Sequence, residues 1–227
     1  MSNKIRTPRW SILICTLGER HERFERLLSR LLPQVDKYKG DIEVIAYWDN
    51  GESRLPIIRQ KMIEYATGEY INFIDDDDMV PEYYCDEIYT LLDGVDYIGW
   101  RMQLYHNGEK MKPTFHSLKY SDWSEDDKGW YRNVSHINPI KRKIAIKGSF
   151  ITEDGEAEDY PWVKQVAPFC KTEHYIDKVM YEYIHSSQDS LWRKKPRSPN
   201  PHTRPIIDNP NFRYHPENSD NYRWQPL

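Results

Sequence analysis

Four consecutive carboxylates, Asp75 to Asp78, directly follow the apolar residues Phe73 and Ile74. Because like charges at this spacing repel, such a cluster needs water or a cation to neutralise it at neutral pH. Carboxylate oxygens suit Mg²⁺ or Mn²⁺, and proteins usually hold these ions together with phosphate groups. The residue types therefore indicate metal-assisted chemistry on a nucleotide diphosphate. An acidic, solvated turn before a helix is the alternative, because a helix N-terminus favours negative charge.

The carboxylates follow a predicted strand at 69–74, which is rich in aromatic and β-branched residues. Open α/β sheets bind ligands at the carboxyl ends of their strands, so this is a favourable place for a site. Strand and helix patterns alternate over the first hundred residues, which predicts a parallel, Rossmann-like half-domain. The other predicted elements are strands at 10–16 and 42–48, a helix at 20–32 ended by Pro33, a helix at 58–66 capped by Gly68, and a helix opened by Pro81.

Beyond Asp96 the pattern changes. We predict a strand or hairpin arm at 96–105, a short helix at 158–166 and a strand at 175–184. Two stretches give weaker signals: 107–135 has no clear period, and 136–148 is basic and partly extended. We expect a single α/β domain over 1–190, with a mixed central sheet, helices on both faces, and halves at about 10–100 and 100–190. An irregular, Pro-rich tail at 191–227 should follow.

Composition limits the class of protein. The 227 residues suit one domain, and 14% aromatic residues compensate for a modest 38% hydrophobic content. The net charge of −4 gives no general bias towards polyanions, although the tail from Leu191 carries +4 and the rest −8. Cys15, Cys85 and Cys170 are too widely spaced for a zinc site, so we expect free thiols. We find no apolar signal or membrane-spanning stretch and expect a soluble, cytoplasmic protein.

Further polar motifs surround the predicted strands in a definite order. They are Thr16-Leu17-Gly18-Glu19-Arg20, Asp49-Asn50-Gly51-Glu52, Arg59-Gln60, Ala66-Thr67-Gly68-Glu69-Tyr70-Ile71, and the carboxylate cluster followed by Pro81. In this order the chain resembles the GT-A glycosyltransferases of the family 2 type, which use a nucleotide sugar. The resemblance covers about residues 10–190, closely in the first half and loosely in the second. It implies a single GT-A, Rossmann-like domain.

The resemblance also implies roles for residues of the first half. Asp49 would accept a hydrogen bond from uracil, Asp75 would hold the ribose or a metal-bound water, and Asp77 would ligate the metal. The implied nucleotide-sugar contacts as a set are Thr16, Gly18, Arg20, Asp49, Arg59, Asp75 and Asp76. Taken singly, Asp49 could be a turn residue and Arg20 a solvated helix residue.

In the second half, the family places its catalytic base, an Asp, at the start of a short helix. The matching residue is Asp159, although Ala157 stands where the family usually has Gly. The acids around it, at 153–158, are expected to raise its pKa towards the range of a useful base. His185 is the candidate that completes the metal or diphosphate site, with His136 as the alternative.

The resemblance thus implies an inverting, metal-dependent glycosyltransferase that moves a sugar from a UDP-sugar to an acceptor hydroxyl, with Mn²⁺ or Mg²⁺. The acceptor stays open between a polysaccharide, a protein and a hydroxymethylated DNA base, the last because of the basic and aromatic tail. One alternative is a nucleotidyltransferase, which would want a more Gly-rich loop after the first strand. Another is a non-catalytic nucleotide-sugar-binding protein.

Overall fold

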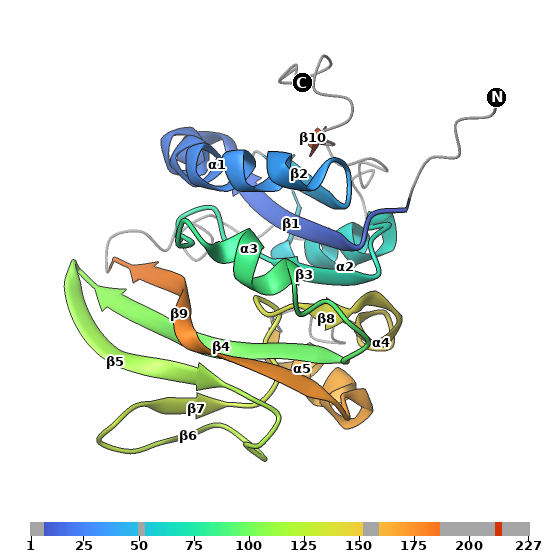
Figure 1. Cartoon of the computed structure of the whole chain (residues 1–227). Coiled ribbons are helices and arrows are strands. Elements are labelled where there is room, and N and C mark those ends of the chain that lie inside the picture. The colour runs from blue at the N-terminus through green and yellow to red at the C-terminus, as the bar shows by residue number, and fades with distance from the viewer. Residues whose placement is uncertain (1–6, 50–52, 152–158, 187–211, 215–227) are drawn as a thin grey trace.

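The computed structural model describes residues 7–49, 53–151, 159–186 and 212–214, and for Asp49 and 212–214 it describes the backbone alone. The first part of the chain alternates strands and helices (Figure 1). In order, these elements are β1 (Trp10–Leu17), η1 (Gly18–Arg20), α1 (His21–Val35), η2 (Asp36–Tyr38), β2 (Ile42–Asp49), α2 (Leu55–Tyr65), β3 (Tyr70–Phe73) and α3 (Tyr84–Tyr89).

The second part is built mainly of strands. Its elements are β4 (Tyr97–His106), β5 (Glu109–His116), β6 (Ser124–Glu125), β7 (Trp130–Arg132), β8 (Ile140–Lys141), α4 (Arg142–Ala145), α5 (Asp159–Val166), η3 (Ala167–Phe169) and β9 (Glu173–His185). A last strand, β10 (Phe212–Tyr214), comes from the tail. Within the described residues, no helix is both long enough and apolar enough to span a bilayer.

All of these strands join one mixed sheet in the order β10-β2-β1-β3-β8-β4-β5-β7-β6, with β9 paired to β4. The strands β1, β2 and β3 are parallel, whereas β8 runs antiparallel to β3 and β5 antiparallel to β4. Since parallel strands end at the same edge, the segments that follow β1, β2 and β3 meet there. Figure 1 shows these three strands above and the β4–β9 part of the sheet below.

Helices cover both faces of the sheet because successive side chains of β1 point to opposite sides. Ile12 packs with Phe24 of α1 in one core cluster, to which α3 also contributes. Leu13 packs in a second cluster with Met62 of α2 and Trp162 of α5, to which α4 also contributes. All eight residues of β1 are buried, which explains its mainly apolar sequence. The predicted GT-A architecture, a mixed sheet with helices on both faces, is confirmed.

The predicted end of the first helix at Pro33 is wrong, because α1 continues to Val35. Proline has no backbone N–H to donate, so α1 loses one intrahelical hydrogen bond at this position. Tertiary contacts hold this last turn. The buried side chain of Gln34 donates to the carbonyl oxygens of Arg30 and Pro81 and accepts from the amide of Cys85. Packing against the start of α3 therefore overrides the local signal.

The predicted cap at Gly68 is also wrong, since α2 ends at Tyr65 and Gly68 has no left-handed backbone. Gly68 instead allows a close approach to β1. Its amide donates to Ser11 Oγ at 2.8 Å, and a Cβ at this position would lie 2.6 Å from both the amide nitrogen and Oγ of Ser11. The glycine thus sets how closely the chain enters β3 beside β1.

Replacing Gly68 with Ala should lower the free energy of unfolding by about 1–3 kcal/mol, the usual cost of overpacking a close contact. Urea denaturation measures the change. The double variant Gly68→Ala/Ser11→Gly is the control, because it removes Oγ but leaves the backbone contact, so only part of the loss should be recovered. An unchanged unfolding midpoint in the single variant would show that β1 and the segment before β3 can move apart freely.

Candidate active site

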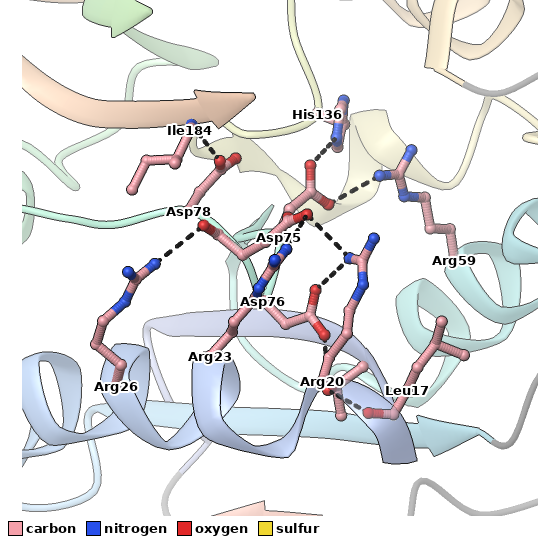
Figure 2. Close-up of polar contacts among 12 residues, drawn as sticks. Leu17, Arg20, Arg23, Arg26, Arg59, Asp75, Asp76, Asp78, His136 and Ile184 are labelled. Carbon is pink, nitrogen blue, oxygen red and sulfur yellow. Dashed lines mark hydrogen bonds and ion pairs between the residues drawn. The ribbon is translucent and has the colours of Figure 1, made fainter. Parts of the chain in front are cut away.

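The carboxylate loop Asp75–Asp78 follows β3 at the carboxyl edge of the parallel strands, as predicted. Two backbone hydrogen bonds hold it. The amide of Ile74, just before the loop, donates to the carbonyl of Leu13 in β1, and within the loop the amide of Asp78 donates to the carbonyl of Asp75. Figure 2 shows that the side chains of Asp75, Asp76 and Asp78 point in different directions, each towards its own partners. The loop thus separates charges that a regular strand or helix would leave closer together.

Asp76 is fully buried and joins the loop to the segment after β1. Thr16 Oγ1 donates to one of its oxygens and Arg20 Nη1 to the other, both at 2.7 Å. Burial raises the pKa of Asp76, while the Arg20 charge and the Thr16 hydrogen bond oppose that shift. Gly18 begins the short turn η1 that brings Arg20 to this position. Two of the predicted nucleotide contacts, Thr16 and Arg20, therefore both bind a third, Asp76.

Asp77 is 21% exposed and lies 3.1 Å from Arg20 Nη1 and 3.9 Å from Arg23 Nη1. Burial raises the pKa of Asp77 to about 6; the Arg20 charge opposes this, and the charges of Asp75 and Asp76 add to it. A carboxylate with this environment gains from any added cation. The chemistry of Asp77 thus suits a metal ligand, and its role at a metal stays a prediction.

Asp75 faces the second half of the domain and is 28% exposed. Arg59 of α2 donates to its Oδ1 at 3.0 Å, and His136 Nε2 lies 4.0 Å from its Oδ2 (Figure 2). The guanidinium of Arg59 also sits over the rings of Phe73 and Phe150, which fix its direction. Asp75 and Arg59, both predicted to contact the nucleotide sugar, thus form one ion pair at the edge of the sheet.

His136 connects the carboxylate loop to Asp159, the first residue of α5. Its Nδ1 lies 3.2 Å from Asp159 Oδ2, on the opposite side of the ring from the nitrogen that faces Asp75. Burial would raise the pKa of Asp159, but His136 and the charge of Arg59 hold it well below its usual range. The pKa of Asp159 is therefore lowered, whereas the sequence predicted that it would be raised. The acids at 153–158, on which that expectation depended, lie outside the described residues.

Asp78 anchors the loop to β9. It is buried, and its two oxygens accept hydrogen bonds from the hydroxyl of Tyr181 at 2.8 Å and the amide of Ile184 at 2.7 Å. Tyr181 in turn accepts from the amide of Asp75 at 3.0 Å. Burial and the charges of Asp75 and Asp77 raise the pKa of Asp78 well above its usual range. Asp78 and Tyr181 therefore position the loop, a role for which the sequence pattern gave no sign.

His185, a predicted metal ligand, follows directly at the end of β9. Its Nδ1 lies 2.9 Å from Nδ1 of His106, and the two rings are stacked. Across the described part of the chain, no group of three or more His, Cys, Asp or Glu side chains is arranged to hold a metal ion. Mg²⁺ and Mn²⁺ sites commonly use one or two carboxylates and substrate phosphates. Asp75 and Asp77 fit that simpler ligand set.

Asp49, predicted to contact uracil, is the last residue of β2 and lies opposite Leu17 in the β1–β2 register. Its side chain and the residues 50–52 that follow lie outside the described residues. The backbone thus brings Asp49 to the same edge as Thr16 and Asp75, and its role stays a prediction.

The strand order and the carboxylate loop define a GT-A glycosyltransferase fold. Among solved structures, the chain is similar to S. aureus TarS, a GT-A-type family 2 glycosyltransferase, with 16% identity over 78% of this chain and 37% of that one, at a TM-score of 0.60. It also matches TarS 1-349 in complex with UDP-GlcNAc (16% identity, 78% and 58% coverage, TM-score 0.54) and with UDP (17%, 78% and 61%, TM-score 0.56).

The chain thus spans between 37% and 61% of the length of these similar structures. A scan against models of protein families and a search among curated proteins found no match. The similarity confirms the fold implied by the resemblance in the sequence.

Replacing Arg20 with Gln should lower the free energy of unfolding by about 3–5 kcal/mol, because Asp76 is left buried without its cation. Arg23→Gln is the matched control. Arg23 is partly exposed and 3.9 Å from its partner, so its loss should cost no more than about 1 kcal/mol. Urea denaturation at pH 7 compares the two. Adding Asp76→Asn to Arg20→Gln should recover part of the loss; equal effects of both arginine variants would contradict a structural Arg20–Asp76 pair.

Asp77→Asn should raise the free energy of unfolding of the ligand-free protein by about 1–3 kcal/mol at pH 8 and leave it unchanged below about pH 4. The pKa of Asp77 is higher in the folded protein, about 6, than in the unfolded chain, so the folded state loses stability as Asp77 ionises between about pH 4 and 6. Denaturation at a series of pH values measures this dependence.

Asp86→Asn is the control of opposite sign. Hydrogen bonds from Lys37 and Tyr38 lower the pKa of Asp86, so its ionisation stabilises the fold and the variant should lose stability above about pH 4. If Asp77→Asn follows the same direction as Asp86→Asn, the ion pair with Arg20 outweighs the burial of Asp77.

Proposed function

We propose that this protein is a glycosyltransferase that uses a UDP-sugar as donor and transfers the sugar, with inversion, to an acceptor hydroxyl. The observation that carries the proposal is the pair of carboxylates on either side of His136. Asp75 lies 4.0 Å from one ring nitrogen and Asp159 3.2 Å from the other. One carboxylate belongs to the loop after β3, where nucleotides bind in this type of sheet, and the other faces it from the second half.

The donor would lie at the carboxyl edge of β1, β2 and β3. Asp49 would accept a hydrogen bond from uracil, and Asp75 would hold the ribose or a metal-bound water. Arg59, which already bonds Asp75, would reach the diphosphate. Thr16 and Arg20, which both bond Asp76, and Gly18, which begins the turn that carries Arg20, would support this pocket. The complexes of TarS 1-349 with UDP-GlcNAc and with UDP support the choice of a UDP-linked donor.

A divalent cation, Mn²⁺ or Mg²⁺, would be held by Asp77, with Asp75 beside it and His185 as the further predicted ligand. When bound, such an ion offsets the negative charge that develops on the departing diphosphate. Burial, together with the charges of Asp75 and Asp76, raises the pKa of Asp77, so a cation bound beside it would favour the ionised carboxylate, which supports this role.

Asp159 would act as the base. Its oxygen takes the proton of the acceptor hydroxyl while the acceptor oxygen attacks the anomeric carbon, and the bond from that carbon to the diphosphate breaks. The lowered pKa of Asp159 in the ligand-free protein keeps the carboxylate ionised at neutral pH. A bound diphosphate adds negative charge near Asp75 and His136, and this raises the pKa of Asp159 towards the useful range of a base.

A nucleotidyltransferase is the weaker alternative. The segment after β1, where that class would carry a Gly-rich phosphate loop, is a short turn whose Arg20 is buried against Asp76. A non-catalytic nucleotide-sugar-binding protein would need no carboxylate at position 159. Release of UDP from a UDP-sugar with added acceptor identifies a glycosyltransferase. A nucleotidyltransferase would instead release pyrophosphate from UTP and a sugar phosphate, and a binding protein would release neither product.

Asp159→Asn should reduce sugar transfer by at least about 100-fold, because general-base contributions are typically about 10²–10⁴-fold. Affinity for UDP, measured by calorimetry, should stay within about threefold. Asp93→Asn is the matched control, since Asp93 is an exposed carboxylate before β4, and it should keep full activity. Transfer by Asp159→Asn at the rate of the control would remove Asp159 from the mechanism. If Glu158→Gln is the inactive variant instead, the base is the neighbouring residue.

A further inference from the structure

A hollow of about 230 Å³ lies on the hairpin formed by β6 and β7. The residues that line it are Trp123, Ser124, Glu125, Trp130, Tyr131 and Arg132. Glu125 pairs with Trp130 across the two strands, and Trp123 precedes β6 with its side chain 40% exposed. Two tryptophans and a tyrosine thus surround a surface hollow in a region that the donor site does not use.

The aromatic rings of this hollow are fixed before any ligand arrives. The guanidinium of Arg132 lies 3.7 Å from the ring centre of Trp123, and Tyr160 meets the same ring edge-to-face at 5.0 Å. Trp130 Nε1 donates to Glu125 at 2.6 Å. Rigid aromatic side chains bind partners at low cost in conformational entropy. Such a preformed surface suits recognition better than it suits simple packing.

The hollow is next to Asp159. Tyr160, which contacts Trp123, follows Asp159 directly in α5, and Lys164 one turn later bonds Asp122 at 3.0 Å. On the other side, the charge of Asp159 acts on Arg132 and opposes the lowering of the Arg132 pKa by burial. Two elements far apart in sequence, the hairpin and α5, therefore bring the aromatic rings beside the carboxylate proposed as the base.

We propose that the hollow lined by Trp123, Trp130 and Arg132, with Tyr160 packed against Trp123, is the acceptor subsite, and that it binds a neutral saccharide. This inference rests on the proposed function. A pyranose ring offers an apolar face of C–H groups to an indole and hydroxyl groups around its rim, so one ring can stack on Trp123 while a hydroxyl reaches Asp159. Glu125 and Arg132 supply an acceptor and donors for the remaining hydroxyls.

The charge of the hairpin favours a neutral acceptor over a polyanion. Residues 119–132 carry three basic and four acidic side chains, and Lys164, which pairs with Asp122, adds a fourth basic group, so the two signs balance. A DNA or phosphate-polymer acceptor would need an excess of basic groups to replace its counterions. The hairpin has no such excess, so DNA is the less suitable occupant.

The test uses the full chain with UDP, and the probe is a printed array of neutral gluco-, galacto- and manno-oligosaccharides. DNA containing hydroxymethylcytosine and poly(glycerol phosphate) form the polyanion arms. The wild-type protein should bind at least one neutral saccharide with little dependence on salt, and Trp123→Ala should weaken that binding about tenfold or more. Trp123→Phe should recover part of it. Phe169→Ala is the matched control, because Phe169 is 45% exposed and contacts Lys147 outside the hollow.

UDP affinity, measured on the same samples, should be equal in all variants, which shows that each is folded. The proposal is overturned if no neutral saccharide binds, if Trp123→Ala binds as well as the wild type, or if only the polyanions bind, with a steep dependence on salt. If saccharide binding depends on Trp123 but no UDP-sugar is turned over, the proposed function fails while the saccharide site stands. If transfer occurs and Trp123→Ala leaves saccharide binding unchanged, the function stands and this subsite falls.

Discussion

Neutralising four adjacent carboxylates is the constraint on which the site depends. The loop solves it by distributing the partners: Arg20 contacts both buried Asp76 and partly exposed Asp77, Arg59 pairs with Asp75, and Tyr181 and a backbone amide bind Asp78. These partners come from the β1–α1 junction, from α2 and from β9. The electrostatics of four residues therefore fix how three separate elements meet at the edge of the sheet.

His136 lies between the two halves of the domain and is close to a carboxylate of each. Its ring stands between a carboxylate of the first half and one of the second, and neighbouring Phe73 and Phe150 pack against it. Because its ring is nearly buried, a change of charge on either carboxylate is felt by the other across a few ångströms of protein rather than water. Binding of an anion beside Asp75 would therefore change the proton affinity of Asp159.

The parallel half of the fold could be predicted because its signals are local. The strands β1 to β3 are buried on both faces and read as short apolar runs, and the carboxylate loop follows from the residue order. The second half depends on pairing between distant segments. The strand β5 begins with exposed, charged residues and carries no apolar pattern, so only its register with β4 defines it. One local signal was present, since Asn107-Gly108 forms the tight turn between these strands with both φ angles positive.

The predictions for the site divide in the same way, between residues placed by local signals and contacts that exist only in the folded sheet. Ordered motifs placed Asp75, Arg59 and Arg20 at one edge, because each follows or faces a strand end. The contacts of Asp78 with Tyr181, and of Asp159 with His136, join residues 103 and 23 positions apart and depend on the folded sheet. The expected raised pKa of Asp159 failed for this reason: it considered neighbours in sequence, whereas the histidine and arginine that decide the shift are neighbours only in space.

The strand β10 covers one edge of the sheet. It pairs antiparallel with β2 through Phe212–Tyr214, opposite Val44 to Ala46, at the end of the strand order. Those β2 residues are buried and apolar, and their outer backbone groups would otherwise form an open edge. A chain shortened before residue 212 would present an unpaired apolar strand that a second molecule can extend. For this protein, removing the tail to obtain a smaller domain therefore exposes a strand edge that favours association between molecules.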